Sequence, residues 1–292
     1  MVRDLSSHAA PAFSGGLDPA AFFCGPAEEE ALARLEWLVA ERQRCGLVIA
    51  DSGMGKSHLA MMAARRLAGL GAEVAVLSLA GLSEGDWTDL LLARLPLDPA
   101  SRGEAIRPWL KLENRLRENT LMGRPTVLIF DDLDRGPTDA REGVARLAAA
   151  GEPRFAGTVV VATATPAGLP QVPDAVRQRA AVRIDLPGWG GDEVAGYLGR
   201  ELERAGLSGE LFTPAAAQTI QRFARGSRRD VRRLAHLAVA AAVGQGLTSI
   251  DPATIEQVWR ELAPPDAPPP LAAPVSTAAH PQVRPVRRLW DG

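Results

Sequence analysis

The sequence predicts an α/β domain with a parallel five-stranded sheet flanked by helices, followed by a small all-helical domain. Two observations predict this order. Between residues 21 and 187, short apolar runs alternate with helical stretches, a pattern typical of parallel strands joined by helical crossovers. Beyond Pro187 the apolar runs give way to segments with helix-start patterns.

The first domain is expected to open on a helix near 26–44, in which Ala31, Leu35, Leu38 and Val39 recur at helical spacing. A buried strand near 47–50 and a helix from Lys56 to Leu70 come next. Further strands are predicted at 73–79, 126–130, 158–162 and 182–186, and helical stretches at 87–95, 104–118 and 139–150. This alternation justifies the parallel sheet.

The second domain is expected over 188–262. Thr213-Pro214 and Asp251-Pro252 each combine an N-cap residue with proline at the first helical position. Ser227, with Asp230 three residues on, resembles a capping box. One apolar stripe follows, formed by Val231, Leu234, Leu237, Ala238 and Ala241.

Composition bounds the rest of the chain. Its 292 residues are 46% hydrophobic, with a net charge of −2, so no global basic field attracts nucleic acid. We expect residues 1–20 to form a loose arm and residues 263–292 a disordered tail, since eight of the 23 prolines follow Ala263. The two cysteines form no extracellular disulfide framework. No apolar stretch reaches the roughly 18 residues of a membrane span, so a cytoplasmic protein is expected.

A phosphate-binding loop follows the first strand. Its residues are Ala50, Asp51, Ser52, Gly53, Met54, Gly55, Lys56 and Ser57, with alanine where the first glycine usually stands. Such a turn directs backbone N–H groups at phosphate oxygens, and the next helix adds the positive end of its dipole. Lys56 can reach the β- and γ-phosphates, and the Ser57 hydroxyl can ligate Mg²⁺. Only Lys56 and Lys111 are lysines among 33 basic residues, which indicates a need for a compact ammonium here.

A second half-site is predicted where the strand at 126–130 ends in two carboxylates, Asp131 and Asp132. Asp131 would hold the metal through water, and Asp132 would act as general base toward the attacking water. A polar residue after the next strand would lie between the γ-phosphate and that water. Thr165 is the first candidate and Thr163 the second, although both threonines could instead bond the strand-end backbone.

Several arginines are further candidates. Arg177 and Arg179 could reach the γ-phosphate of a neighbouring subunit as arginine fingers, or be ordinary surface residues. The most basic stretch comprises Arg222, Arg225, Arg228, Arg229, Arg232 and Arg233. It could sense phosphate, form a DNA patch or be a solvated helix face.

These residues resemble the AAA+ ATPases, and more closely the general secretion pathway protein A-like group, over about residues 20–262. The lead-in Phe22-Phe23-Cys24-Gly25 and the helix Glu30-Ala31-Leu32-Ala33-Arg34-Leu35 match that group. So do Arg177-Gln178-Arg179, Leu186-Pro187, Phe212-Thr213-Pro214 and Gly226-Ser227-Arg228-Arg229. In this chain, Ala50 replaces a glycine, Asp132 a glutamate, and Arg228 the proline of the last motif.

The resemblance implies ATP and Mg²⁺ binding, slow hydrolysis and nucleotide-dependent self-assembly into a homo-oligomer. It implies phosphate and metal roles for Lys56 and Ser57, a metal role for Asp131, a base role for Asp132 and a lid-sensor role for Arg229. Related ATPases also serve DNA transposition and replication initiation. Secretion-type members often carry a membrane span and a wall-binding domain, for which this sequence shows no pattern.

Three functions therefore remain open. The first is an ATPase that drives assembly or remodelling of a partner protein. The second is an ATP-binding switch that hydrolyses poorly, because the Asp132 carboxylate is one methylene shorter than the usual glutamate. The third is a DNA-associated regulator that uses the arginines of the helical domain. A small-molecule kinase is disfavoured, because the helical domain follows the whole sheet instead of interrupting it.

Overall fold

A computed structural model describes residues 13, 21–96, 107–149, 155–207 and 210–262. One parallel sheet has the strand order β2-β3-β4-β1-β5. Its strands are β1 (Cys45–Ile49), β2 (Glu73–Ser78), β3 (Thr126–Asp131), β4 (Thr158–Ala164) and β5 (Val182–Asp185). The predicted five-stranded parallel sheet is confirmed, and β4 lies between β1 and β3.

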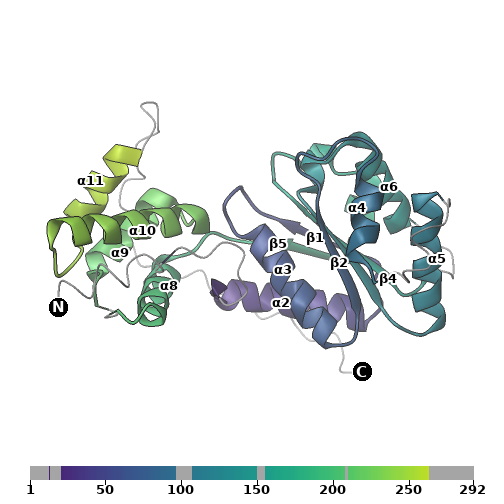
Figure 1. The fold of residues 1–292 in the computed structure, drawn as a ribbon, viewed down its shortest axis with the longest axis horizontal. Coiled ribbons are helices and arrows are strands. Elements are labelled where there is room, and N and C mark those ends of the chain that lie inside the picture. The colour runs from purple at the N-terminus through teal and green to yellow at the C-terminus, as the bar shows by residue number, and fades with distance from the viewer. Residues whose placement is uncertain (1–12, 14–20, 97–106, 150–154, 208–209, 263–292) are drawn as a thin grey trace, which may run out of the picture.

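Helices cover both faces of the sheet (Figure 1). One face carries α2 (Pro26–Ala40) and α3 (Lys56–Gly69), and its core includes Val48 and Ile129. The other face carries α4 (Trp87–Arg94), α5 (Pro108–Leu121), α6 (Thr138–Ala149) and α7 (Asp174–Arg179). Successive strand residues alternate between the two cores. Burial on both faces explains why the inner strands β1, β3 and β4 are largely apolar runs in the sequence.

The helical region, defined as α8 (Gly191–Arg204), α9 (Pro214–Ala224), α10 (Arg228–Gln245) and α11 (Pro252–Leu262), follows the sheet. It has its own hydrophobic core, in which Phe13 is also buried. The predicted caps form. Thr213 Oγ1 accepts from the Ala216 N–H at 3.1 Å, Ser227 Oγ from the Asp230 N–H at 3.3 Å, and Asp251 Oδ1 from the Thr254 N–H at 2.9 Å.

Several element boundaries differ from the sequence prediction, and one short helix was not predicted. The first helix ends at Ala40, since Arg42 adopts a left-handed backbone with φ 50°. Strand β4 continues to Ala164 and so includes Thr163. The short helix α7, which carries Arg177 and Arg179, was not predicted because its six residues are too few to show a helical period.

Some predicted segments lie outside the described residues. These are most of the arm at 1–20, the start of the helical stretch at 104–118 and the tail at 263–292. Among the described residues, no helix is both long and apolar enough to cross a bilayer.

Gly143 allows α6 to pack directly on Trp87 of α4. A Cβ atom at this position would lie 2.1 Å from Trp87 Cζ2, and Trp87 is itself buried against Phe130. We expect Gly143→Ala to lower the free energy of unfolding by about 1–3 kcal/mol, because overpacking outweighs the gain in helix propensity. Urea denaturation measures the change.

Gly199→Ala is the matched control. Gly199 also lies within a helix, α8, but an added Cβ would meet no atom within 4 Å. The free energy of unfolding should rise by up to about 1 kcal/mol in this variant. Equal effects of the two substitutions would contradict the packing described for α6.

Candidate functional site

The loop at 50–57 begins where β1 ends. The Ala50 N–H donates to Ala164 O at 3.2 Å, so the loop leaves the sheet beside β4. Gly53 and Gly55 have φ values of 84° and 90°, a left-handed conformation that glycine adopts without steric cost. Gly55 directly precedes α3, so the first N–H groups of that helix adjoin the loop. The Ala50 methyl is buried in the core beneath α2 and α3, which explains how alanine is accommodated.

Lys56 is buried at the start of α3. Its Nζ donates to Ala50 O at 2.8 Å and to Asp51 O at 3.2 Å. Carbonyl acceptors satisfy an ammonium that would otherwise be buried without partners. The lysine is therefore held inside the loop, next to the N-terminus of α3.

Asp131 and Asp132 lie at the carboxyl end of β3. Thr163 Oγ1 on β4 donates to Asp131 Oδ1 at 2.6 Å and accepts from the Asp132 N–H at 2.9 Å. One hydroxyl thus orients both predicted site residues. Thr163, the second candidate for a contact with the attacking water, is buried and does not line the cavity described below.

Asp132 has an unusual backbone and an unusual acidity. Its φ of 54° and ψ of 47° are left-handed, which aspartate tolerates several-fold better than most residues. Burial raises the pKa of the Asp132 carboxyl above its ordinary value, and the Asp131 charge adds to the increase, while Lys56 opposes it.

Thr165, the first candidate for the water contact, is held by Asp134. Its Oγ1 donates to Asp134 Oδ2 at 2.6 Å and its N–H donates to the same oxygen at 3.1 Å. The Gly168 N–H donates to Thr165 Oγ1 at 3.0 Å. The hydroxyl therefore has a fixed direction, although it still borders the cavity described next.

A cavity of about 420 Å³ is bordered by the loop at 50–57, by the helical region and by the carboxyl end of β3. We call this end of β3, with Asp131 and Asp132, the carboxylate edge. The cavity is lined by Ser52, Gly53, Gly55, Lys56 and Ser57 of the loop, by Asp132, Arg135 and Thr165, by Arg228, Arg229 and Arg232, and by Ala21, Phe22, Phe23, His58, Trp189, Tyr197 and Glu201. This volume is within the range of about 300–1,000 Å³ common for small-molecule sites. The lining offers both cationic side chains and aromatic rings, which suit an anionic ligand with a flat apolar group.

The helical region contacts the loop directly. The Arg229 N–H donates to Gly53 O at 3.2 Å, and Arg229 Nη1 donates to Ser52 Oγ at 3.2 Å. A Cβ atom on Gly53 would lie 2.6 Å from Ser227 Oγ. Arg229, predicted as a lid sensor, therefore touches the loop already in the structure.

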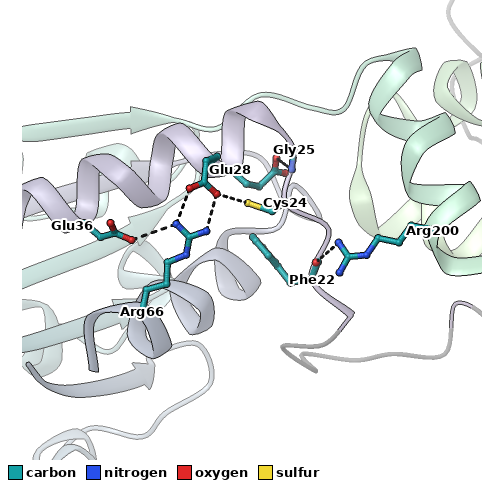
Figure 2. A network of polar contacts seen from close by, with 8 residues as sticks. Phe22, Cys24, Gly25, Glu28, Glu36, Arg66 and Arg200 are labelled. Carbon is teal, nitrogen blue, oxygen red and sulfur yellow. Dashed lines mark hydrogen bonds and ion pairs between the residues drawn. The ribbon is translucent and has the colours of Figure 1, made fainter. Parts of the chain in front are cut away.

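The lead-in segment 22–25 runs between the sheet domain and the helical region (Figure 2). Arg200 Nη1 of α8 donates to Phe22 O at 2.9 Å, and the Phe22 ring lies 5.0 Å from the His58 ring of α3. On the other side, the Cys24 thiol donates to Glu29 at 3.1 Å, and Arg66 pairs with the same glutamate at 2.7 Å. Partial burial and Glu29 raise the pKa of Cys24 to about 11, so this thiol stays protonated.

The remaining arginine candidates are dispersed. Arg177 and Arg179 are exposed on α7 and do not line the cavity, and Arg177 pairs with Asp174. Of the basic stretch, Arg228, Arg229 and Arg232 face the cavity, whereas Arg222 pairs with Glu256 at 3.6 Å. The stretch is therefore not one continuous basic face.

The donor set suits Mg²⁺. Ser57 lines the cavity, whereas Asp131 is buried and does not. A hydroxyl and a carboxylate are both hard oxygen ligands of the kind that Mg²⁺ prefers. Within the described ranges, no group of three or more His, Cys, Asp or Glu side chains could hold a metal alone.

Sequence reasoning missed Glu28, Asp134, Trp189 and Tyr197. The last two border the cavity, and Asp134 orients Thr165. The Asp-Asp-Leu-Asp sequence at 131–134 could have marked Asp134, because a third carboxylate so close to a strand end needs a partner. Nothing local distinguishes Glu28 from its acidic neighbours Glu29 and Glu30.

The arrangement is a parallel α/β fold with a glycine loop after β1, followed by a helical region. No protein-family model and no curated protein matches the sequence. Among solved structures, the Thermotoga maritima RuvB Holliday junction branch migration motor is 16% identical, with a TM-score of 0.54, over 80% of this chain and 68% of RuvB.

Two further solved structures also match. The Aeropyrum pernix ORC2 protein, in ADPNP–ADP complexes, is 18% identical with a TM-score of 0.60, over 80% of this chain and 67% of ORC2. A chain of Drosophila ORC bound to DNA is 18% identical with a TM-score of 0.64, over 89% of this chain and 66% of that one. The chain therefore has the fold of an AAA+ P-loop ATPase.

Thr163 gives a direct test of the carboxylate edge. Thr163→Val removes the hydroxyl that donates to Asp131 and accepts from the Asp132 N–H, so we expect the free energy of unfolding to fall by about 1–3 kcal/mol. Thr158→Val on the same strand is the control. The buried Thr158 Oγ1 has no hydrogen-bond partner among the described residues, so this change should be neutral or stabilising. Urea denaturation compares the two, and equal losses would contradict a special role for Thr163.

Proposed function

We propose that this protein is an AAA+ ATPase that binds and hydrolyses Mg-ATP to drive nucleotide-dependent assembly or remodelling of a partner protein. The observation that carries the proposal is the convergence of three elements on one cavity. These are the glycine loop with Lys56, the carboxylate edge at Asp132, and the helical region with Arg229 on the loop.

Phosphate binding is assigned to the loop. The turn at Gly53 and Gly55 and the N-terminus of α3 would present N–H groups to phosphate oxygens. Lys56 would exchange its carbonyl acceptors for phosphate oxygens, a charge-assisted contact that is stronger than the neutral one it replaces. Ser57 and Asp131 would hold Mg²⁺, which neutralises phosphate charge when bound.

Hydrolysis is assigned to Asp132. A raised pKa makes this carboxylate a stronger base than an ordinary aspartate toward the attacking water. Thr165, oriented by Asp134, would hydrogen-bond the water or the γ-phosphate. Arg229 would report the phosphates to the helical region.

Self-assembly would complete the site. Arg177 and Arg179 are exposed and away from the cavity of their own subunit. In a homo-oligomer, either side chain could therefore act on a neighbour's γ-phosphate as an arginine finger. Within the AAA+ proteins, the motifs favour the general secretion pathway protein A-like group.

The main alternative is an ATP-binding switch with little or no turnover, favoured by the short Asp132 side chain. A DNA-associated regulator is the third candidate, in line with the fold of RuvB and of ORC bound to DNA. The dispersal of the arginines argues against a DNA patch on α10. A DNA affinity that falls steeply with salt concentration would nonetheless support the DNA-associated regulator.

Lys56→Ala should weaken Mg-ATP binding by about 10- to 100-fold, the value of a charge-assisted hydrogen bond. Lys111→Ala is the matched control, since Lys111 is the only other lysine and does not line the cavity. Isothermal titration of ATP measures both affinities. Unchanged affinity in Lys56→Ala would refute the assigned site.

Asp132→Asn separates an ATPase from a switch. Asparagine also tolerates the left-handed backbone, so ATP affinity should stay within a few-fold while phosphate release slows by about 100-fold or more. If the wild type shows no turnover and Asp132→Glu creates it, the switch is the correct function. Release of inorganic phosphate from purified protein is the measurement.

A further inference from the structure

A buried ion pair between Glu28 and Arg228 joins four separate segments of the chain. Arg228 Nε donates to Glu28 Oε1 at 2.8 Å, and Nη2 contacts the same oxygen. Arg228 Nη1 donates to Met54 O in the phosphate loop and, at 3.1 Å, to Pro187 O before the helical region. Glu28 is 1% exposed and the Arg228 side chain 12%. One guanidinium therefore connects α2, the loop, the connection at Pro187 and α10.

The carboxylate partner is fully engaged. Glu28 Oε1 also accepts from Trp189 Nε1 at 2.9 Å, and Oε2 accepts from the Gly25 N–H at 3.1 Å. The Trp189 ring lies 5.1 Å from Arg228 Cζ, within the range of a cation–π contact. Such a set of fixed partners leaves the guanidinium one orientation.

The orientation of the guanidinium determines the direction of one peptide in the phosphate loop. In a trans peptide the C=O and N–H point in opposite directions. A guanidinium bonded to Met54 O therefore turns the Gly55 N–H away from itself. Arg228 also packs on Gly55, where an added Cβ would lie 2.6 Å from Arg228 Cδ. Arg228 thus contacts the carbonyl oxygen of Met54 and the α-carbon of Gly55, the two residues whose shared peptide would face phosphate.

We infer that Arg228, held by Glu28, is a positioning residue that sets the Met54–Gly55 peptide for phosphate binding and couples that peptide to the helical region. The inference rests on the proposed ATP binding and concerns a residue distinct from Arg229, which contacts Ser52 and Gly53. Nucleotide that shifts the loop must then shift Arg228, Trp189 and the connection at Pro187 together.

A purely structural ion pair makes a different prediction. Buried ion pairs often add little net stability. If Glu28 and Arg228 only fasten the two parts of the chain, losing them changes the unfolding midpoint but leaves the nucleotide response of the folded protein unchanged. The test must therefore measure nucleotide affinity and the response of Trp189.

Arg228→Pro removes the side chain with little change to the backbone. Arg228 is the first residue of α10, where proline is well tolerated. Ser227 has φ −64° and ψ 116°, the extended conformation that a residue before proline requires. Arg233→Ala is the matched control, because Arg233 is exposed on the same helix and does not line the cavity.

The first measurement is the Kd of Mg-ATP by isothermal titration. We expect about a tenfold or greater increase in Arg228→Pro, in line with the loss of a charge-assisted hydrogen bond, and less than a twofold change in Arg233→Ala. The second is the ATP-induced change in Trp189 fluorescence, defined as the difference between wild type and Trp189→Phe. This change should be present in wild type and lost in Arg228→Pro.

Glu28→Gln provides a second variant if Arg228→Pro does not fold. It keeps the size of the side chain but removes the charge that holds Arg228, so the Kd should rise at least threefold. Wild-type affinity and an intact Trp189 response in a folded variant would overturn the inference. Failure of the wild-type protein to bind ATP at all would instead overturn the proposed function, and the inference with it.

Discussion

The pairing of β4 with both β1 and β3 is the constraint on which the site depends. Ile49 is paired with Ala164 at one edge of β4, and Phe130 with Ala162 at the other. The loop after β1 and the carboxylates after β3 therefore emerge on either side of one strand, at the same end of the sheet. Because a shift of register by one residue turns every side chain to the opposite face, Thr163 would then lose both aspartates.

The second organising feature is polar contact across the junction with the helical region. Gly53 O and Met54 O accept hydrogen bonds from α10 rather than from their own domain. Unpaired carbonyls in a part-buried loop are costly. The loop conformation therefore depends on residues at 228 and 229 as well as on its own glycines.

The sequence predicted the features that local patterns encode. Strands buried on both faces are apolar runs, the loop combines glycines and lysine at fixed spacing, and Thr213 and Asp251 cap helices through atoms three residues away. It could not predict contacts that only the fold creates. Glu28 and Arg228 are 200 residues apart in the sequence, and Asp134 and Thr165 are 31 residues apart. The sequence alone does not show that a charged residue will be buried, because its partner comes close only in the folded chain.

Gly53 and Gly55 both lie against the residues at the start of α10. A side chain at either position would collide with Ser227 or Arg228 even if no phosphate were bound. Their small size therefore serves the seating of α10 as well as the approach of a ligand. Replacing either glycine would therefore lower nucleotide affinity in two ways, by displacing the helical region and by blocking the phosphate site. Only the displacement would also alter the structure of the nucleotide-free protein.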